Sequence, residues 1–457
     1  MFYCLQKKKK MVLAEQREDT GQLMSERHEY ELKLVQVIFR HGARTPLKPI
    51  PHKEQLLQVC YSSLQRSDSF PESQELFAPS AHNLSLVEWP PTLLDIPLHT
   101  QFDYKVTDLS GGPRPTSPIE KRYREHKLKG GTFPGQLTTV GMQQMFELGA
   151  RLRRTYVEEF GFLSPSLNPA EVFVRSTNIV RNLESTRCLL AGLFQQQQQN
   201  ETLKERREKR EMGPVAILTC DLNTEILFPN YHGCLGLKHL SSNKMLHAYS
   251  QPEISEELQK LQQKMGLEEE KIKEVDFFLL LDNLLAEEAH GLAGSLVLKD
   301  MLQQIEQRAI DIIFYVLEPD EREVLQLSVG PFLYILQDNM LQTANGSSAT
   351  TKSRKLFLYA VHDTTLIPLL TALGIFDNKW PPYAADLVLE LYQHQYSKMW
   401  FVRLCYKGEE QVLKGCRTAL CTLDEFLNRI SAYALSPDEY STLCTQGEQQ
   451  HPPGNTN

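Results

Sequence analysis

The sequence predicts an α/β fold: a three-layer core with a central mixed, mostly parallel sheet and helices on both faces, plus a mainly helical cap domain. Two observations support the core. Short apolar runs with the length of buried strands recur along the chain, and segments with helical spacing of apolar residues follow them. A third observation supports the cap, because residues 251–345 alternate Glu, Gln and Lys with Leu, Ile and Phe and lie between core strands in the sequence.

The first part of the core is predicted to contain one strand, one insertion and one helix. Residues 1–30 are polar and charged, and we expect them to be disordered. The apolar run at 32–41 predicts the first strand. Residues 52–87 contain Ser, Gln, Glu and scattered Pro, which is typical of an insertion that can be disordered. Thr138 is a suitable N-cap, and apolar residues at helical spacing follow it as far as Tyr156.

The remaining core elements follow from the same patterns. Strands are predicted at 171–175, 215–219, 356–361, 386–393 and 399–406, and helices at 178–194 and 364–373. Asp363 is a candidate N-cap for the last helix, and Gly374 is a candidate C-cap. The core domain is therefore assigned to residues 31–235 and 350–445, the cap to 240–348, and a disordered tail to 446–457.

The segment Arg40-His41-Gly42-Ala43-Arg44-Thr45-Pro46 directly follows the first predicted strand. Guanidinium groups offer forked donors to phosphate oxygens, and a neutral imidazole has a nitrogen that can attack phosphorus. The segment therefore suggests phosphoryl chemistry. Taken alone, it is also compatible with a basic turn whose side chains face solvent.

Two further segments support a site at the edge of the sheet. His362 and Asp363 follow the strand at 356–361. Open α/β sheets bind ligands outside the carboxyl ends of their strands, so two strands that end in complementary side chains favour one shared site. Arg175 ends a third strand and is predicted to be another phosphate ligand. The alternative for Arg175 is an ordinary position at an exposed helix start.

Together these segments resemble the histidine acid phosphatases, a branch of the phosphoglycerate mutase-like superfamily. The resemblance is carried by R-H-G-x-R-x-P at 40–46, V-R-S-T at 174–177 and H-D at 362–363, and it covers roughly residues 30–55 and 88–445. A narrower resemblance, to members of this family that act on a lysophospholipid, is carried by residues 130–131, 135–138, 140–146, 175–194 and 380–382. It implies hydrolysis of lysophosphatidic acid to monoacylglycerol and phosphate, and a location in the mitochondrion.

The resemblance implies a phosphoric monoester hydrolase with specific residue roles. His41 is the nucleophile that becomes phosphohistidine, and Asp363 donates a proton to the leaving alcohol. The residues implied to bind the phosphoryl oxygens are Arg40, Arg44, Arg175 and His362. Fixed cations can stabilise the charge on the equatorial oxygens as Mg²⁺ does in kinases, so neither a metal nor a cofactor is expected.

These roles require particular protonation states of His41 and Asp363. His41 must be unprotonated on the attacking nitrogen. Nearby Arg charges lower the pKa of His41 and a bound phosphate raises it, and the sequence leaves the balance open. Asp363 must instead hold its proton, and a neighbouring phosphate anion raises its pKa. An acidic pH optimum follows from this pair of requirements.

Composition excludes several other classes of protein. The 457 residues include 49 Lys and Arg against 57 Asp and Glu, and the net charge of -8 argues against a nucleic-acid binder. No apolar run reaches about 18 residues, so no transmembrane segment is expected. The basic start, with Lys7 to Lys10, lacks an apolar region of secretory length, and no targeting presequence is evident. We expect a monomer.

Cysteine and histidine spacing gives no metal site. The nine cysteines lack CxxC spacing, so a zinc site is not expected, although Cys416 and Cys421 are close enough in sequence to pair in an oxidising compartment. Glu287, Glu288 and His290 lie on adjacent turns, but no second His stands at the i, i+4 position. We assign no metal there.

The part of the substrate that is not phosphate would be bound by the cap. A small phosphate ester, and by resemblance a lysophospholipid, needs an apolar channel for its acyl chain, and the cap residues 277–281 are candidates for that channel. The alternative is that these residues pack the cap onto the core. Two other functions also remain open, namely a phytase or phosphosugar phosphatase of the same superfamily and a non-catalytic module that binds lipids or anions.

Overall fold

The structure is a computed structural model that describes residues 29–50, 87–194, 214–264, 275–292, 299–317, 322–346 and 354–450. The predicted disordered segments at 1–30 and 52–87 lie almost entirely outside the described residues, and residues 451–457 of the predicted tail do so as well. The other end of that tail differs from the prediction, because helix α16 (Pro437–Gln450) continues into the segment 446–457.

Nine strands of the described residues form one sheet, in the order β2-β4-β3-β5-β1-β6-β7-β8 with β9 paired to β7. They are β1 (Tyr30–Arg40), β2 (Tyr104–Thr107), β3 (Val172–Ser176), β4 (Val215–Leu218), β5 (Leu356–Val361), β6 (Asp386–His394), β7 (Trp400–Tyr406), β8 (Glu409–Gln411) and β9 (Leu420–Thr422). The strands from β2 to β1 pair in parallel, whereas β1, β6, β7, β8 and β9 pair antiparallel. The sheet is mixed as predicted, but its antiparallel part is larger than the sequence indicates.

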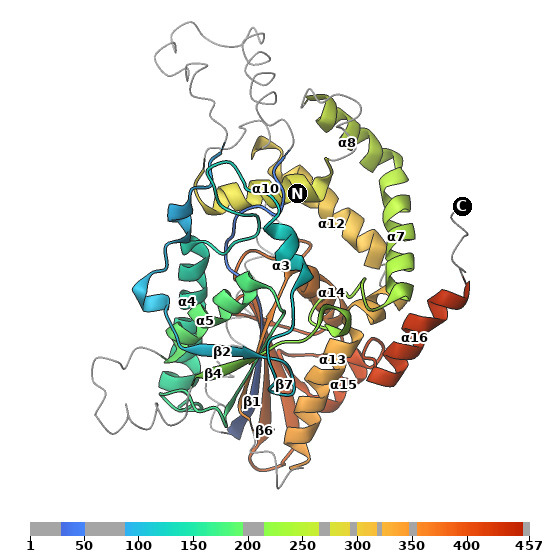
Figure 1. Ribbon diagram of the computed structural model, residues 1–457. Coiled ribbons are helices and arrows are strands. Elements are labelled where there is room, and N and C mark those ends of the chain that lie inside the picture. The colour runs from blue at the N-terminus through green and yellow to red at the C-terminus, as the bar shows by residue number, and fades with distance from the viewer. Residues whose placement is uncertain are drawn as a thin grey trace, which may run out of the picture.

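One face of the sheet is covered by α4 (Thr139–Arg153) and α5 (Val180–Phe194), as Figure 1 shows. Their apolar side chains pack onto Val35, Val37 and Phe39 of β1. The two helices approach closely through Gly149 and Gly192. A Cβ atom at either position would lie 2.1 Å from a backbone oxygen of the other helix, so only glycine fits there. Thr138 caps α4 as predicted, because its side chain accepts a hydrogen bond from the Gly141 N–H.

The opposite face is covered by α13 (Glu323–Ala344), α14 (Asp363–Leu373) and α15 (Leu423–Ile430), and α16 packs against α13. The α13 helix contacts the sheet directly: Gln36 donates from Nε2 to the Leu336 carbonyl at 2.9 Å, and the Phe332 ring lies 5.1 Å from that of Tyr359. The predicted cap boundary at residue 348 is therefore too late in the chain. A buried core helix and a cap helix have the same apolar periodicity, so the sequence of α13 alone does not show to which part of the molecule this helix belongs.

In the part of the chain that the structure describes, four helices stand above the carboxyl ends of the parallel strands, and we call them the cap (Figure 1). They are α7 (Leu235–Ser250), α8 (Pro252–Lys264), α10 (Phe277–Ala289) and α12 (Leu302–Leu317). The cap has an apolar cluster of its own, in which Phe277, Leu280 and Leu281 are buried against Ile305 and Ile312. Packing within the cap thus accounts for these members of the predicted acyl channel. Phe278 is only partly buried.

Two disulfides within the described residues reinforce the fold. Cys416 pairs with Cys421, the pairing considered from the sequence. Cys234 pairs with Cys444 across a separation of 210 residues and so joins the start of α7 to α16. The remaining described elements are short: η4 (Pro91–Leu94), η5 (Leu98–Thr100), α3 (Pro118–Tyr123), the π-helical turn η6 (Arg154–Glu159) and η7 (Leu222–Thr224). No described helix combines the length and apolar character that crossing a membrane requires.

Candidate active site

The segments that follow β1 and β5 lie next to each other. The two strands are parallel neighbours, and Arg40 is level with Val361 in their register. His41 and His362 therefore leave the sheet at the same height, and their ring centroids are 5.6 Å apart. The structure brings together the two motifs that are about 320 residues apart in the sequence, as expected for the carboxyl ends of parallel strands.

The loop that carries His41 is held by close backbone packing. A Cβ atom on Gly42 would lie 2.2 Å from the Gly141 carbonyl oxygen, so the first turn of α4 touches the loop directly. The Ala43 carbonyl accepts hydrogen bonds from the backbone N–H and the hydroxyl of Thr138. The residue that caps α4 therefore also fixes the loop after His41.

The geometry assigns the tautomer of His41. Its Nδ1 lies 2.9 Å from the Gly42 carbonyl oxygen, which can only accept a hydrogen bond. Nδ1 therefore carries the proton, and Nε2 is left with a free lone pair. Burial lowers the pKa of His41 well below its usual value, and the charges of Arg181, Arg44 and Arg40 lower it further. The imidazole of His41 is therefore neutral in the free protein.

Three arginines around His41 have buried donors without a partner. Arg40, Arg44 and Arg181 are all at least 95% buried, with relative exposures of 2%, 3% and 5%. Within the described residues, Nε of each of them, and Nη1 of Arg181, makes no hydrogen bond. A buried donor that lost its water without gaining an acceptor costs about 1–3 kcal/mol. Clustered cationic donors of this kind indicate a site for an anion.

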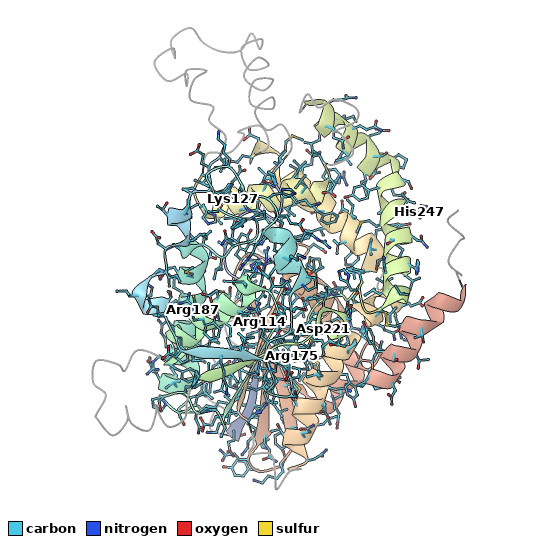
Figure 2. The ribbon with its side chains drawn as sticks, in the orientation of Figure 1. Arg114, Lys127, Arg175, Arg187, Asp221 and His247 are labelled. Carbon is cyan, nitrogen blue, oxygen red and sulfur yellow. A yellow bond between two sulfur atoms is a disulfide. The ribbon has the colours of Figure 1, made fainter. Side chains whose placement is uncertain are left out.

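Arg175 does not lie in this cluster, in contrast to the prediction. In the register it is level with Tyr359 and hence with Ile38, about 10 Å below His41 at roughly 3.3 Å per residue. Its Nη2 donates to Glu225 Oε1 at 3.1 Å, and both side chains are buried. Figure 2 labels Arg175 close to the strands, below Arg114 in the view. Although its Nε also lacks a partner, its charge is balanced by Glu225.

Arg181 takes the place that the prediction gave to Arg175. It lies in the first turn of α5, the helix that follows β3, and its guanidinium carbon is 5.5 Å from the centre of the Tyr123 ring. A helix that follows a strand begins at the carboxyl edge of the sheet, so its first turn is well placed to reach a ligand there. That rule, applied to the sequence, would have favoured Arg181 over Arg175.

Asp363 lies in the first turn of α14, and His362, not Asp363, is the N-cap of the helix. Gly374 ends the helix in the left-handed conformation, as predicted. Asp363 Oδ2 forms an ion pair with Arg40 Nη2 at 2.6 Å and accepts a hydrogen bond from Trp380 Nε1 at 3.1 Å. Although burial opposes ionisation, the charges of Arg40 and Arg44 lower the pKa of Asp363 to about 2. The carboxyl is therefore ionised while no anion occupies the site.

His362 is also buried and neutral. Its Nε2 lies 3.0 Å from the Thr177 hydroxyl, and burial, followed by the charge of Arg181, lowers its pKa well below the usual value. The neighbouring Asp363 opposes this effect. His362 thus adds no positive charge beside those of Arg40, Arg44 and Arg181.

Two side chains in contact with the arginines were not anticipated. Asp282 of α10 pairs with Arg44, Oδ1 to Nη2 at 2.7 Å, and accepts from the Leu47 N–H at 2.8 Å. The Tyr383 ring lies under the Arg40 guanidinium at 4.4 Å. Both residues come from segments far from the motifs in sequence, and neither has a local pattern that marks it.

The cluster Glu287, Glu288 and His290 has a structural use. His290 Nδ1 lies 2.6 Å from the Ala286 carbonyl and Nε2 lies 2.7 Å from the Thr138 hydroxyl, so both ring nitrogens contact protein atoms. The histidine thereby joins α10 to the N-terminus of α4. Elsewhere in the described residues, one group of possible metal ligands contains Cys416 and Cys421, whose sulfurs are bonded to each other.

Comparison with known proteins identifies the family. A family model for the histidine phosphatase superfamily (branch 2) matches residues 31–407. Lysophosphatidic acid phosphatase type 6 of Homo sapiens is 50% identical over 98% of this chain and 93% of that protein. The Mus musculus protein of the same name is 49% identical over 98% of this chain and 95% of its own length.

A solved structure with the same fold is the multiple inositol polyphosphate phosphatase of Bifidobacterium longum in complex with inositol hexasulfate. It has a TM-score of 0.54 and 13% identity, and the match covers 90% of this chain and 94% of that one. At this identity the likeness concerns the fold alone. From the family match and the two relatives, the chain belongs to the histidine phosphatase superfamily, branch 2, and is a phosphoric monoester hydrolase.

Proposed function

We propose that this protein is a metal-independent acid phosphatase that hydrolyses lysophosphatidic acid to monoacylglycerol and phosphate through a phosphohistidine at His41. The observation that carries the proposal is the set of unpartnered donors on Arg40, Arg44 and Arg181 around a neutral His41 whose Nε2 is free. Such donors can hold the oxygens of a phosphoryl group while the nitrogen attacks phosphorus.

The reaction has two steps. His41 Nε2 forms a bond to phosphorus as the bond to the ester oxygen breaks, and Asp363 gives its proton to that oxygen, so the alcohol leaves neutral. Water then attacks phosphorus and gives a proton back to the Asp363 carboxylate. Phosphate leaves, and His41 is again neutral with a free Nε2. Arg40, Arg44 and Arg181 hold the phosphoryl oxygens throughout.

The proton on Asp363 is explained by the charge of the substrate. The carboxyl is ionised in the free protein because Arg40 and Arg44 lower its pKa to about 2. A bound phosphate offsets those charges and raises the pKa. A phosphate monoester has a second pKa of about 6, so below that pH the ester arrives with a proton that Asp363 can take. This supports an acidic pH optimum.

An apolar surface beside Asp363 supports a lipid substrate. Trp380 donates to the carboxylate, and its ring lies 6.1 Å from the partly buried ring of Phe278 in the cap. The leaving group of lysophosphatidic acid carries an acyl chain that suits such rings. The identity of about 50% to the mammalian lysophosphatidic acid phosphatases supports the same substrate.

One observation favours a polyphosphate substrate instead. An exposed basic stretch lies on both sides of Tyr123 in the sequence, and the Tyr123 ring contacts Arg181 of the site. Its exposed cations are Lys121, Arg122, Arg124, Lys127 and Lys129. Lys127 lies toward α10 in the view of Figure 2. A basic rim is what several phosphates on one substrate would require, so the phytase alternative enters the test below.

The test compares three esters in the presence of a chelator: lysophosphatidic acid, an inositol hexakisphosphate and 4-nitrophenyl phosphate. We expect the fastest phosphate release from the lipid, with no release by His41→Ala. Asp363→Ala should lose far more activity on the alkyl ester than on the aryl ester, whose leaving group needs little protonation. Preference for the polyphosphate would favour a phytase, and no release from any ester would favour a binding module.

Location and assembly are part of the same proposal. The resemblance of the motifs supports a mitochondrial location, and we also propose that the protein is a monomer. Fractionation of cells that express the full chain with a C-terminal tag tests the first, since a tag found outside the mitochondrial fraction would contradict it. Light scattering coupled to size-exclusion chromatography tests the second, because a mass near twice 52.5 kDa would indicate a dimer.

A further inference from the structure

The segment 380–383, which precedes β6, makes three contacts with two groups of the site, Arg40 and Asp363. The Pro381 carbonyl accepts from Arg40 Nη1 at 2.5 Å, and the Tyr383 ring lies 4.4 Å from the Arg40 guanidinium. Trp380 Nε1 donates to Asp363 Oδ2 at 3.1 Å. Of these contacts, the one from Trp380 bears directly on the group that protonates the leaving alcohol.

Trp380 holds the carboxyl of Asp363 in a way that Arg40 cannot. Oδ1 of Asp363 accepts from the Thr364 N–H at 2.8 Å, and Oδ2 accepts from Trp380 and forms an ion pair with Arg40. Arg40 is also a phosphate ligand in the proposed function, so a bound phosphate competes with Asp363 for its donors. The indole N–H is neutral and can only donate. It keeps its contact with Oδ2 whether Arg40 faces the carboxylate or the phosphate.

The position of Trp380 is fixed from the cap. Its backbone N–H donates to Glu306 Oε1 of α12 at 2.8 Å, and its ring lies 6.1 Å from that of Phe278 in α10. The Asp363 side chain is itself in contact with the core helix α14 through Thr364. Trp380 is therefore the link through which the cap reaches the carboxyl group.

We propose that Trp380 is a positioning residue for Asp363: its indole N–H orients the carboxyl that protonates the leaving group, and Glu306 and Phe278 make that orientation depend on the cap. The inference rests on the proposed function, since it concerns the same proton donor. It predicts a defect that depends on how much protonation the leaving group needs.

The test is Trp380→Phe in the full chain, which removes the N–H and keeps an aromatic ring. With lysophosphatidic acid, kcat should fall about tenfold, the effect of losing one hydrogen bond to a charged group, while KM changes little. With 4-nitrophenyl phosphate, kcat should change less than about twofold because that leaving group needs little protonation. The loss of a donor to the carboxylate should also move the basic limb of the alkyl-ester profile to higher pH.

Trp400→Phe is the matched control. Trp400 pairs with Gln393 at the opposite edge of the sheet, and the same substitution there should leave both esters and the pH profile unchanged. Glu306→Ala is a second variant that does not touch Asp363. It removes the anchor of the Trp380 backbone and should cause a smaller loss in the same direction, which keeps the inference testable if Trp380→Phe folds poorly.

The outcomes separate this inference from the proposed function. Equal losses on both esters, or no loss on either, in a folded Trp380→Phe protein would overturn the role of Trp380 and leave the phosphatase intact. A wild-type chain that hydrolyses neither ester would overturn the proposed function itself, and the role of Trp380 with it. A selective loss on the alkyl ester, absent in Trp400→Phe, supports the inference.

Discussion

Replacing Arg181 by Gln tests which arginine after β3 serves the site. Arg181 is buried near His41 with two donor nitrogens that have no partner among the described residues. A hydrogen bond between charged groups contributes about 1.5–3 kcal/mol, so the loss of one strong contact to the phosphoryl group predicts a fall of about 10- to 100-fold in kcat/KM. Because the substitution removes a buried unpaired charge, the folded protein should not lose stability.

The pH profile of this variant has a predictable sign. His41 reacts in its neutral form, and after burial Arg181 is the leading cause of its low pKa. Without that charge the pKa of His41 rises toward its usual value. The acid limb of kcat/KM should therefore move to higher pH in Arg181→Gln. A substitution that only disturbed packing would lower the rate without this shift.

Arg175→Gln is the matched control on the same strand-helix unit. It leaves Glu225 as a buried carboxylate without its cation, which costs about 3–5 kcal/mol of folding stability. Activity per folded molecule and the acid limb should stay near wild type. The assay is 4-nitrophenyl phosphate hydrolysis between about pH 4 and pH 8, with thermal unfolding of each variant. If Arg175→Gln instead shifts the acid limb and Arg181→Gln does not, the assignment of Arg181 is refuted.

Three more predictions follow from contacts outside the reacting groups. Asp282→Asn should free Arg44 from its ion pair and strengthen inhibition by inorganic phosphate about threefold to tenfold. Asn283→Ala, at the neighbouring position, should leave that inhibition unchanged. Weaker inhibition of the Asp282→Asn protein by phosphate would contradict this prediction. Gly149→Ala should lower the unfolding free energy by about 1–3 kcal/mol, read from denaturant titration, because its Cβ would meet the Leu189 carbonyl. Cys234→Ser should lower the free energy of unfolding more than Cys421→Ser does, by about 5 kcal/mol against about 2 kcal/mol from chain entropy. The reason is that the Cys234–Cys444 disulfide closes a much longer loop than the Cys416–Cys421 disulfide.

The sequence predicted most of the parallel core because its signals are local. Apolar runs located β1, β3, β4 and β5 to within two residues, and Thr138 and Gly374 marked helix ends by their own chemistry. The short strands β2, β8 and β9 were not predicted, since three or four residues give too little pattern. Apolar periodicity also could not assign α13 to the core instead of the cap.

The site was predictable only where its residues lie inside a motif. His41 and Asp363 follow strands that are neighbours in the sheet, so the topology rule for open α/β sheets brought them together. Arg175 was predicted because it ends a strand, whereas side-chain direction and register decide which arginine reaches the site, and they favour Arg181. Asp282 and Trp380 contact the site from cap and linker segments, and no spacing in the sequence connects them to it.

The cap does more than cover the substrate, because two of its acidic side chains act on the charges of the site. Asp282 neutralises Arg44 directly, and Glu306 holds Trp380, which contacts Asp363. Asp363 in turn pairs with Arg40. Of the three arginines around His41, Arg40 and Arg44 therefore each have a carboxylate partner in the free protein, while Arg181 has none among the described residues. A phosphate must compete for the first two cations but finds the third available, so Arg181 is the group that should contribute most to its initial binding.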